Sequence, residues 1–238
     1  MNNSENSYDK MIDEYIDSEG LDNTPPNPLV PGHLRRSKLH EDVKAQTEPT
    51  ELAVHLKKAI HALTTDADKC LDSTEIKELT QQFSDAIAYL DVIDYTKPME
   101  ENYRNILHFN DSTMASILKI AQYEYNENKI EESLSIFALL AVLEPDDPDY
   151  WHRLGIVAYQ TERYELALKA FNNATTLNTD YLEPRIFAAK CYLNLRQISE
   201  AKRELDVINE LYDDKSLTDP LWKEMIAYIE NMIGKSSN

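Results

Sequence analysis

A period of 34 residues runs through the second half of the chain and restricts the folds that it can adopt. Leu143, Leu177 and Leu211 follow one another at this spacing, and other apolar positions repeat with it. Repeats of this length are typical of helix–turn–helix units, each of which buries its apolar face only by stacking on a neighbour. Residues 113–214 are therefore predicted to form a helical solenoid of three such units.

The composition favours an all-α fold. Only 4 glycines occur among the 238 residues, whereas an average content near 7% would give about 17. A glycine-rich phosphate-binding loop and a turn-dense β fold are therefore excluded. We expect seven consecutive helices over residues 112–233, namely three pairs and a C-terminal capping helix. Asp219 as N-cap and Pro220 as the first helical residue begin that last helix.

The pattern divides the chain into three parts. Residues 1–50 hold half of the chain's 10 prolines and no sustained periodicity, so we expect a mostly disordered, acidic tail. Residues 51–109 show the apolar spacing of at least two helices, the second of which begins with a capping box at Asp72 and Glu75. Residues 110–238 form the three-repeat domain with its capping helix.

One segment of the tail departs from this description. Five apolar residues between positions 8 and 16 have the spacing of one helical face. The segment is either part of the solvated tail or a short helix that folds onto a partner or back onto this protein. The five residues are Tyr8, Met11, Ile12, Tyr15 and Ile16.

The charge of the chain excludes several kinds of partner. Its 43 Asp and Glu against 24 Lys and Arg give a formal net charge of −19, which repels nucleic-acid phosphates and anionic lipids. Stable membrane insertion is not expected, because the longest apolar run, residues 137–143, is far shorter than a span of about 20 residues. No signal peptide is visible, and Cys70 and Cys191 belong to no C-x-x-C pair. These features predict a cytoplasmic protein with reduced thiols.

The sequence contains no pattern typical of an enzyme or a metal site. Its 6 histidines are scattered, and His55 and His61 do not have the spacing of three or four residues that places two ligands on one helical face. Cys191 lies among small and apolar residues, which favours a packed side chain over a nucleophile. We therefore predict no catalytic residue, no bound metal and no cofactor.

The surface that remains for function is the concave face of the solenoid, which the first helix of each unit lines. Apolar and aromatic residues occupy positions there that would otherwise face water, and a monomer rarely leaves such a patch exposed without a use. Alternatively, some of them pack against the helices of residues 51–109. The predicted peptide-binding groove consists of Leu118, Gln122, Tyr125, His152, Ile156, Tyr159, Ile186, Lys190 and Leu193.

The middle unit resembles the tetratricopeptide repeat. Its residues match the Trp, Leu-Gly, Tyr, Ala, Phe and Ala positions of that motif with Trp151, Leu154, Gly155, Tyr164, Ala167, Phe171 and Ala174. The first and third units match less well, as terminal repeats often do. Gly155 and Ala167 are small enough to let the two helices of the unit approach closely.

A longer stretch, residues 105–233, resembles the class II type III secretion chaperones. The resemblance depends on Asn110-Asp-Ser-Thr-Met in the first unit, Asp149-Tyr-Trp in the second and, above all, Phe187-Ala-Ala-Lys-Cys-Tyr-Leu in the third. It implies a cytoplasmic bacterial chaperone that holds the two hydrophobic translocator proteins of an injection apparatus before secretion.

The resemblance also implies how clients and subunits are held. A client segment of the type Pro-x-Leu-x-x-Pro would lie in the concave groove, with its apolar side chains near Leu118, Tyr125, Tyr159 and Ile186. N-terminal helices often form homodimers in that family, which suggests such a role for the apolar stripe of residues 52–63. The chain departs from the family at Lys190, where an acid is frequent, and in its longer N-terminal region.

A function of another class also fits these features. The chain could be a tetratricopeptide-repeat adaptor within a multiprotein assembly, which binds proteins that are already stable and has no chaperone activity. Co-expression with a hydrophobic translocator distinguishes the two, because only a chaperone keeps such a client soluble.

Overall fold

The computed structural model describes residues 51–90, 101–212 and 219–236, which form helices and connecting turns with no β-strand. The chain divides between Val54 and His55, and the contacts reported below lie within residues 55–238. The predictions for the tail of residues 1–50 and for its five apolar residues between positions 8 and 16 lie outside the described ranges.

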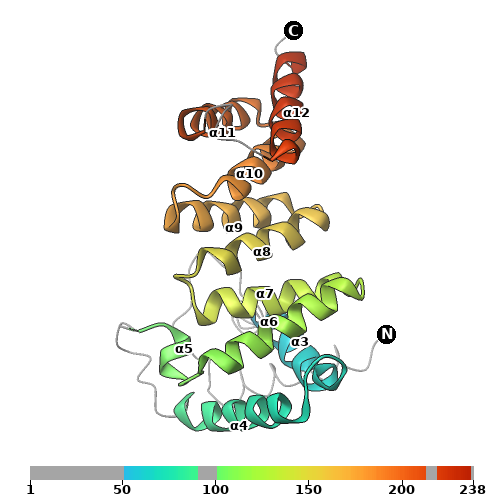
Figure 1. Cartoon of the computed structure of the whole chain (residues 1–238), viewed down its shortest axis with the longest axis vertical. Helices are drawn as coiled ribbons and strands as arrows, with labels where there is room; N and C mark the ends of the chain where they lie inside the picture. The colour runs from blue at the N-terminus through green and yellow to red at the C-terminus, as the bar shows by residue number, and fades with distance from the viewer. Residues whose placement is uncertain (1–50, 91–100, 213–218, 237–238) are drawn as a thin grey trace, which may run out of the picture. The chain divides into compact units, whose positions relative to one another are not determined.

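The described residues form one short 3₁₀ turn and ten α-helices (Figure 1). The N-terminal elements are α3 (Glu51–Thr65), η3 (Ala67–Lys69), α4 (Ser73–Leu90) and α5 (Tyr103–Ile106). They are followed by α6 (Asp111–Asn126), α7 (Ile130–Leu143), α8 (Pro148–Gln160), α9 (Tyr164–Leu177), α10 (Leu182–Asn194), α11 (Ile198–Leu211) and α12 (Pro220–Ser236). The predicted all-α fold and the seven helices from α6 to α12 are confirmed.

The 34-residue period appears in the structure as three stacked helix pairs. Helix α6 packs on α7, α8 on α9 and α10 on α11, and each pair contacts the next through α7 with α8 and α9 with α10. The second helices of the pairs begin at Ile130, Tyr164 and Ile198, at intervals of 34 residues. Each unit therefore buries its apolar face against its neighbours, as the repeat predicts.

The turn inside each pair has the same geometry in all three units. Asn128, Glu162 and Arg196 occupy the left-handed region with φ of 61°, 59° and 59°. The backbone N–H of the next residue donates to a carbonyl five positions earlier, over distances of 2.8 to 3.0 Å. This is the Schellman arrangement that satisfies the last carbonyls of a helix, and here it forms without glycine.

The packing within the middle unit depends on Gly155. A β-carbon at this position would lie less than 3.0 Å from three ring atoms of Phe171. The Phe171 side chain is fully buried, so its ring has little room to move away. Gly155 thus allows the close approach of α8 and α9 that the sequence predicts.

The helix starts follow the capping signals in the sequence. The Asp72 side chain accepts from the backbone N–H of Thr74 and Glu75, and the Glu75 side chain accepts from the Asp72 N–H in return. The Asn110 side chain accepts from Thr113 at the start of α6. The Asp219 side chain accepts from the N–H of Leu221 at the start of α12. These caps satisfy N–H groups that have no partner within the helix.

The N-terminal helices continue the core of the repeats. Ala59, Leu63 and Leu79 belong to the same buried cluster as the apolar side chains of α6 to α8. Glu78 on α4 also accepts from the Asn110 and Ser112 side chains at 2.7 and 2.9 Å, which fastens α4 to the start of α6. These helices therefore cover one end of the solenoid.

Helix α12 covers the other end, as predicted. Its buried residues Ile226, Ile229 and Ile233 form a second cluster with α10 and α11. Ile229 is completely buried, whereas Leu221 on the same helix is 53% exposed. The capping helix thus buries one side and presents the other beside the face that the first helices line.

Candidate functional site

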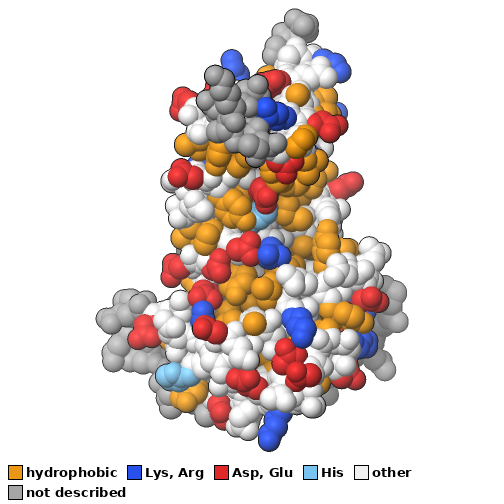
Figure 2. Space-filling model, viewed as in Figure 1, with side chains coloured by type: hydrophobic (Ala, Val, Ile, Leu, Met, Phe, Trp, Pro, Cys, Tyr) orange, Lys and Arg blue, Asp and Glu red, His pale blue; other side chains and the backbone are white. Residues whose placement is uncertain are grey.

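The first helices of the repeats line two hollows, each of about 500 Å³. The first hollow lies between α6, α8 and the start of α10, and the second lies between α8, α10 and α12. On the face drawn in Figure 2, hydrophobic side chains reach the surface between acidic ones over α8 to α12. We use the term groove for the two hollows together. The groove is therefore shared by all three repeats and the capping helix.

Seven of the nine predicted groove residues line these hollows. Gln122, Tyr125, His152 and Ile156 line the first hollow. Tyr159, Lys190 and Leu193 line the second. Most of the predicted set therefore lies on the first helices of the three repeats, α6, α8 and α10, and lines the groove.

The other two predicted residues do not line either hollow. Ile186 is completely buried in the cluster that α10, α11 and α12 form, which corrects the expectation that it faces the groove. The docking of α12 explains the difference, because it covers a position that would be exposed on an uncapped repeat. Leu118 is half-buried and packs against the main core.

The first hollow has a polar wall around His152. The Nδ1 atom of His152 lies 2.8 Å from the hydroxyl of Tyr181, and its Nε2 atom lies 3.6 Å from a carboxylate oxygen of Glu183. Burial lowers the pKa of His152 to about 4, so the imidazole is neutral at pH 7. Burial also raises the pKa of Glu183. This wall therefore combines a neutral imidazole, a phenol and a carboxylate.

Two further charges of the first hollow, those of Arg153 and Asp149, neutralise each other. The Nε of Arg153 donates to a carboxylate oxygen of Asp149 at 2.6 Å, and both residues line the hollow. The carboxylate of Glu183 is then the uncompensated charge among the described residues that line the first hollow. Ile156 and Tyr125 supply apolar surface beside these polar groups, so the hollow can accept a mainly apolar segment with one hydrogen-bonding or basic group.

Tyr159, which lines the second hollow, packs against other aromatic rings. The ring of Tyr159 lies 5.7 Å from that of Tyr164 and 5.6 Å from that of Phe187, both in edge-to-face geometry. Its contact with Phe187 joins the second repeat to the third. The ammonium of Lys190 lies over the rings of Tyr159 and Phe187, and burial lowers the pKa of this lysine.

Tyr125 and Tyr159 occupy equivalent positions in successive repeats but have different surroundings. Gln160 donates a hydrogen bond to the hydroxyl of Tyr125 and so links the first repeat to the second. Tyr159 instead packs with two other aromatic rings, and burial raises its pKa. Tyr159 therefore lines the groove and also holds two repeats together.

The sequence did not single out several lining residues. Tyr181 lies 34 positions after Asp147, the N-cap of α8, so the repeat itself could have pointed to it. The α12 residues could not be assigned to the groove, because their place depends on how α12 docks on α10. The α12 residues that line the second hollow are Leu221, Glu224, Met225, Tyr228 and Met232.

Outside the groove, the described residues offer neither an accessible Cys191 thiol nor a metal-binding group. Cys191 is completely buried, and burial raises the pKa of its thiol to about 12. Within the described residues no three His, Cys, Asp or Glu side chains are grouped to hold a metal ion. None of the described helices combines the length and the apolar character that crossing a membrane requires.

Comparison with known sequences finds relatives for the repeat region. Residues 158–227 match the tetratricopeptide repeat family. The low calcium response locus protein H of Yersinia pseudotuberculosis is 27% identical over 126 residues, which are 52% of this chain and 71% of that protein. The chaperone protein SicA of Salmonella typhimurium is 27% identical over 93 residues, which are 39% of this chain and 56% of SicA.

Comparison with solved structures finds one chain with the same fold and a second, more distant match. A type III secretion system complex from Aeromonas hydrophila matches with a TM-score of 0.50 and 18% identity, over 58% of this chain and 89% of that chain. The type III secretion chaperone SycD from Yersinia enterocolitica, solved in complex with a peptide of the translocator YopD, matches with a TM-score of 0.47 and 22% identity. That match covers 54% of this chain and 95% of SycD.

Proposed function

We propose that this chain, a relative of the class II type III secretion chaperones, is a bacterial chaperone that holds hydrophobic translocator proteins before their secretion. The resemblance to that family is confirmed by the sequence similarity to the low calcium response locus protein H and to SicA. SicA is a chaperone by name, and a translocator peptide is the ligand in the SycD complex.

The observation that carries the proposal is the groove itself. The first helices of three successive repeats line two neighbouring hollows with apolar and aromatic side chains and a few polar groups. An extended client segment can place apolar side chains against Ile156 and Leu193, while the side-chain amide of Gln122 faces its backbone. Such a site binds a segment rather than a folded surface, which suits a client that is not yet folded.

The charge of the chain fits the same role. A net charge of −19 keeps the chaperone and any complex that it forms apart from other acidic molecules and from anionic lipids. A hydrophobic client bound in the groove is therefore shielded from aggregation and from premature contact with a membrane. The proposal places this activity in the cytoplasm and requires no catalytic step.

Self-association belongs to the same proposal. Ile60 on α3 and Ile87 on α4 are 48% and 65% exposed, and Ile60 belongs to the apolar stripe of residues 52–63. These side chains supply apolar surface for contact with a second copy. Sedimentation should detect a dimer at micromolar concentration, and replacement of both residues with Glu should shift the protein to a monomer. An unchanged oligomer would place the interface elsewhere.

Co-expression tests the main proposal. The full chain is expressed with each of the two hydrophobic translocators of the secretion system of its own bacterium. We expect the translocator to become soluble and to co-purify with the chain, and Ile156→Asp in the groove to abolish both effects. Lys169→Asp, at an exposed position of α9, serves as the matched control.

The same experiment distinguishes a chaperone from an adaptor without chaperone activity. If the translocators remain insoluble and the chain instead co-purifies with a protein that is soluble alone, it is an adaptor without chaperone activity. If the Ile156 and Lys169 variants behave alike, binding occurs outside the groove.

A further inference from the structure

The second hollow carries a cation that the fold does not neutralise. The ammonium of Lys190 lies 5.0 Å from the ring centre of Tyr159 and 4.9 Å from that of Phe187. Among the described residues, it forms neither an ion pair nor a hydrogen bond. Contacts with aromatic faces orient an ammonium but use none of its three N–H donors. Lys190 therefore presents a hydrogen-bond donor with a full charge at the rim of the hollow.

This arrangement contrasts with the first hollow. There Arg153 is neutralised by Asp149 at 2.6 Å, and Glu183 remains as the uncompensated charge. In a chain with 43 acidic residues, a partly buried lysine without a carboxylate partner is unusual. A desolvated charge is costly unless an opposite charge joins it, and the hollow beside it is open to a ligand.

The walls of the second hollow are mainly apolar. Leu193 of α10 lines a space of about 500 Å³ together with Leu221, Met225 and Tyr228 of α12. Methionine side chains adapt to apolar groups of different shapes. Glu224 is the acidic residue among those that line the hollow; its side chain is exposed, where water screens its charge.

We infer that the second hollow binds a client segment in which an Asp or Glu side chain stands beside a large apolar side chain. The carboxylate accepts hydrogen bonds from the Lys190 ammonium, and the apolar side chain fills the space between Leu193 and Met225. Charge complementarity selects this occupant over a basic or purely apolar segment. The inference rests on the proposed function, because it names the chemistry of the client that the groove selects.

A peptide array tests the inference without a known client. The array carries acetylated and amidated 12-residue peptides in matched pairs, which differ by Glu or Gln beside a single Leu, Phe or Met. Full-length protein is applied as the wild type, as Lys190→Gln and as Lys202→Gln, which removes the same charge at an exposed position of α11. The readout is the ratio of binding to the two members of each pair, which does not depend on how much of a variant is folded.

We expect the wild type and Lys202→Gln to prefer the Glu peptides by about tenfold, the usual effect of one charge-assisted hydrogen bond. Lys190→Gln should bind both members of a pair alike, and Lys190→Arg should retain the preference. Equal binding by the wild type, no binding of any peptide, or a preference that survives Lys190→Gln would overturn the inference. If a translocator still co-purifies with the wild type in such a case, the proposed chaperone function stands and only the stated client chemistry fails.

Discussion

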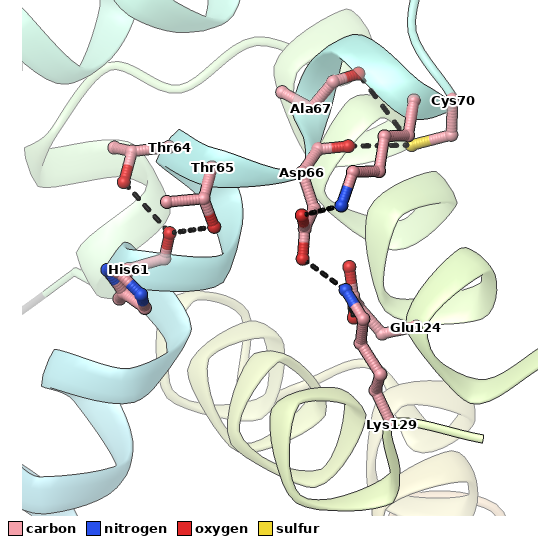
Figure 3. Close-up of polar contacts among 9 residues, drawn as sticks. His61, Thr64, Thr65, Asp66, Ala67, Cys70, Glu124 and Lys129 are labelled. Atoms are coloured by element: carbon pink, nitrogen blue, oxygen red, sulfur yellow. Dashed lines mark hydrogen bonds and ion pairs between the residues drawn. The ribbon is translucent and has the colours of Figure 1, made fainter. Parts of the chain in front are cut away.

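The ammonium of Lys129 donates to the carboxylate of Asp66 over 2.5 Å, although the two residues are 63 positions apart. The same ammonium lies 3.1 Å from Glu124, whose side chain is completely buried. Figure 3 shows Lys129 between the two carboxylates, which come from the turn after α3 and from α6. Hydrogen bonds from Lys129 and Lys69 lower the pKa of Asp66, whereas burial raises the pKa of Glu124. One lysine thus fastens the N-terminal helices to the first repeat.

Replacement of Lys129 with Met should therefore destabilise the protein strongly. It leaves a buried and a nearly buried carboxylate without their shared cation, and a buried charge that loses its partner strongly destabilises a folded protein. Lys69 also contacts Asp66, but its side chain is 46% exposed, so Lys69→Met should lower the free energy of unfolding much less than Lys129→Met. Urea unfolding of both variants measures the difference. Equal losses would show that the buried Glu124 does not depend on Lys129.

The neutral imidazole in the first hollow predicts a pH dependence of stability. The pKa of His152 is about 4 in the folded protein, against an ordinary value of 6.5. As the pH falls below 6.5, the unfolded chain takes up a proton that the folded protein does not, so stability is lost between pH 6.5 and pH 4 and no further below that range. The loss due to this residue should be on the order of 3 kcal/mol.

A variant series isolates this contribution. His152→Gln removes the titrating group, and its free energy of unfolding should change less between pH 7 and pH 4 than that of the wild type. His61→Gln, at an exposed position of α3, should follow the wild type. Parallel curves for the wild type and His152→Gln would mean that His152 has the same pKa in the folded and the unfolded protein.

Two Gly→Ala changes should have opposite effects on stability, because Gly155 lies in the close contact between α8 and α9 and Gly234 lies in open space on α12. Gly155→Ala places a methyl group against the buried ring of Phe171, and such overpacking costs about 1 to 3 kcal/mol. Gly234→Ala meets no atom within 4 Å and should stabilise α12 by up to about 1 kcal/mol. Thermal melts and urea unfolding compare them. A neutral Gly155→Ala would show that the repeat accommodates a wider helix separation.

The sequence predicts those features of the fold that depend on local spacing. The capping box at Asp72 and the N-cap pair Asp219-Pro220 lie within a few residues of the helices that they begin. Both helix starts can therefore be predicted without knowledge of tertiary contacts. Gly155 and Phe171 are likewise set at fixed positions of a repeat whose geometry is shared between units. Period and local chemistry therefore define the solenoid.

Tertiary docking decides what the sequence could not. Ile186 has the spacing of a groove residue, but α12 covers it, and Leu221 of the same helix reaches the hollow instead. Ile60 lies in an apolar stripe of α3, yet it is exposed because the helix turns only part of that stripe toward the core. The apolar spacing within one helix does not predict how a later helix packs against it.

The two groove tyrosines should separate binding from folding. The Tyr159 ring packs against Phe187 of the next repeat, so Tyr159→Ala should lower the free energy of unfolding by roughly 2 kcal/mol and also weaken client binding. Tyr125 contributes a hydrogen bond with Gln160 and half-buried surface, so Tyr125→Ala should cost only about 1 kcal/mol in stability. If Tyr125 is an anchor of the client, its loss should still weaken binding about thirtyfold.

Urea unfolding and the affinity for a co-purified translocator, both measured at a temperature where each variant is folded, compare these effects. Tyr125→Phe is the control for Tyr125→Ala, because it keeps the ring and removes only the hydroxyl that Gln160 contacts. It should bind the client nearly as well as the wild type, since the anchor acts through apolar contact. If Tyr125→Ala loses as much stability as Tyr159→Ala and binds the client normally, Tyr125 is a packing residue and the client lies elsewhere in the groove.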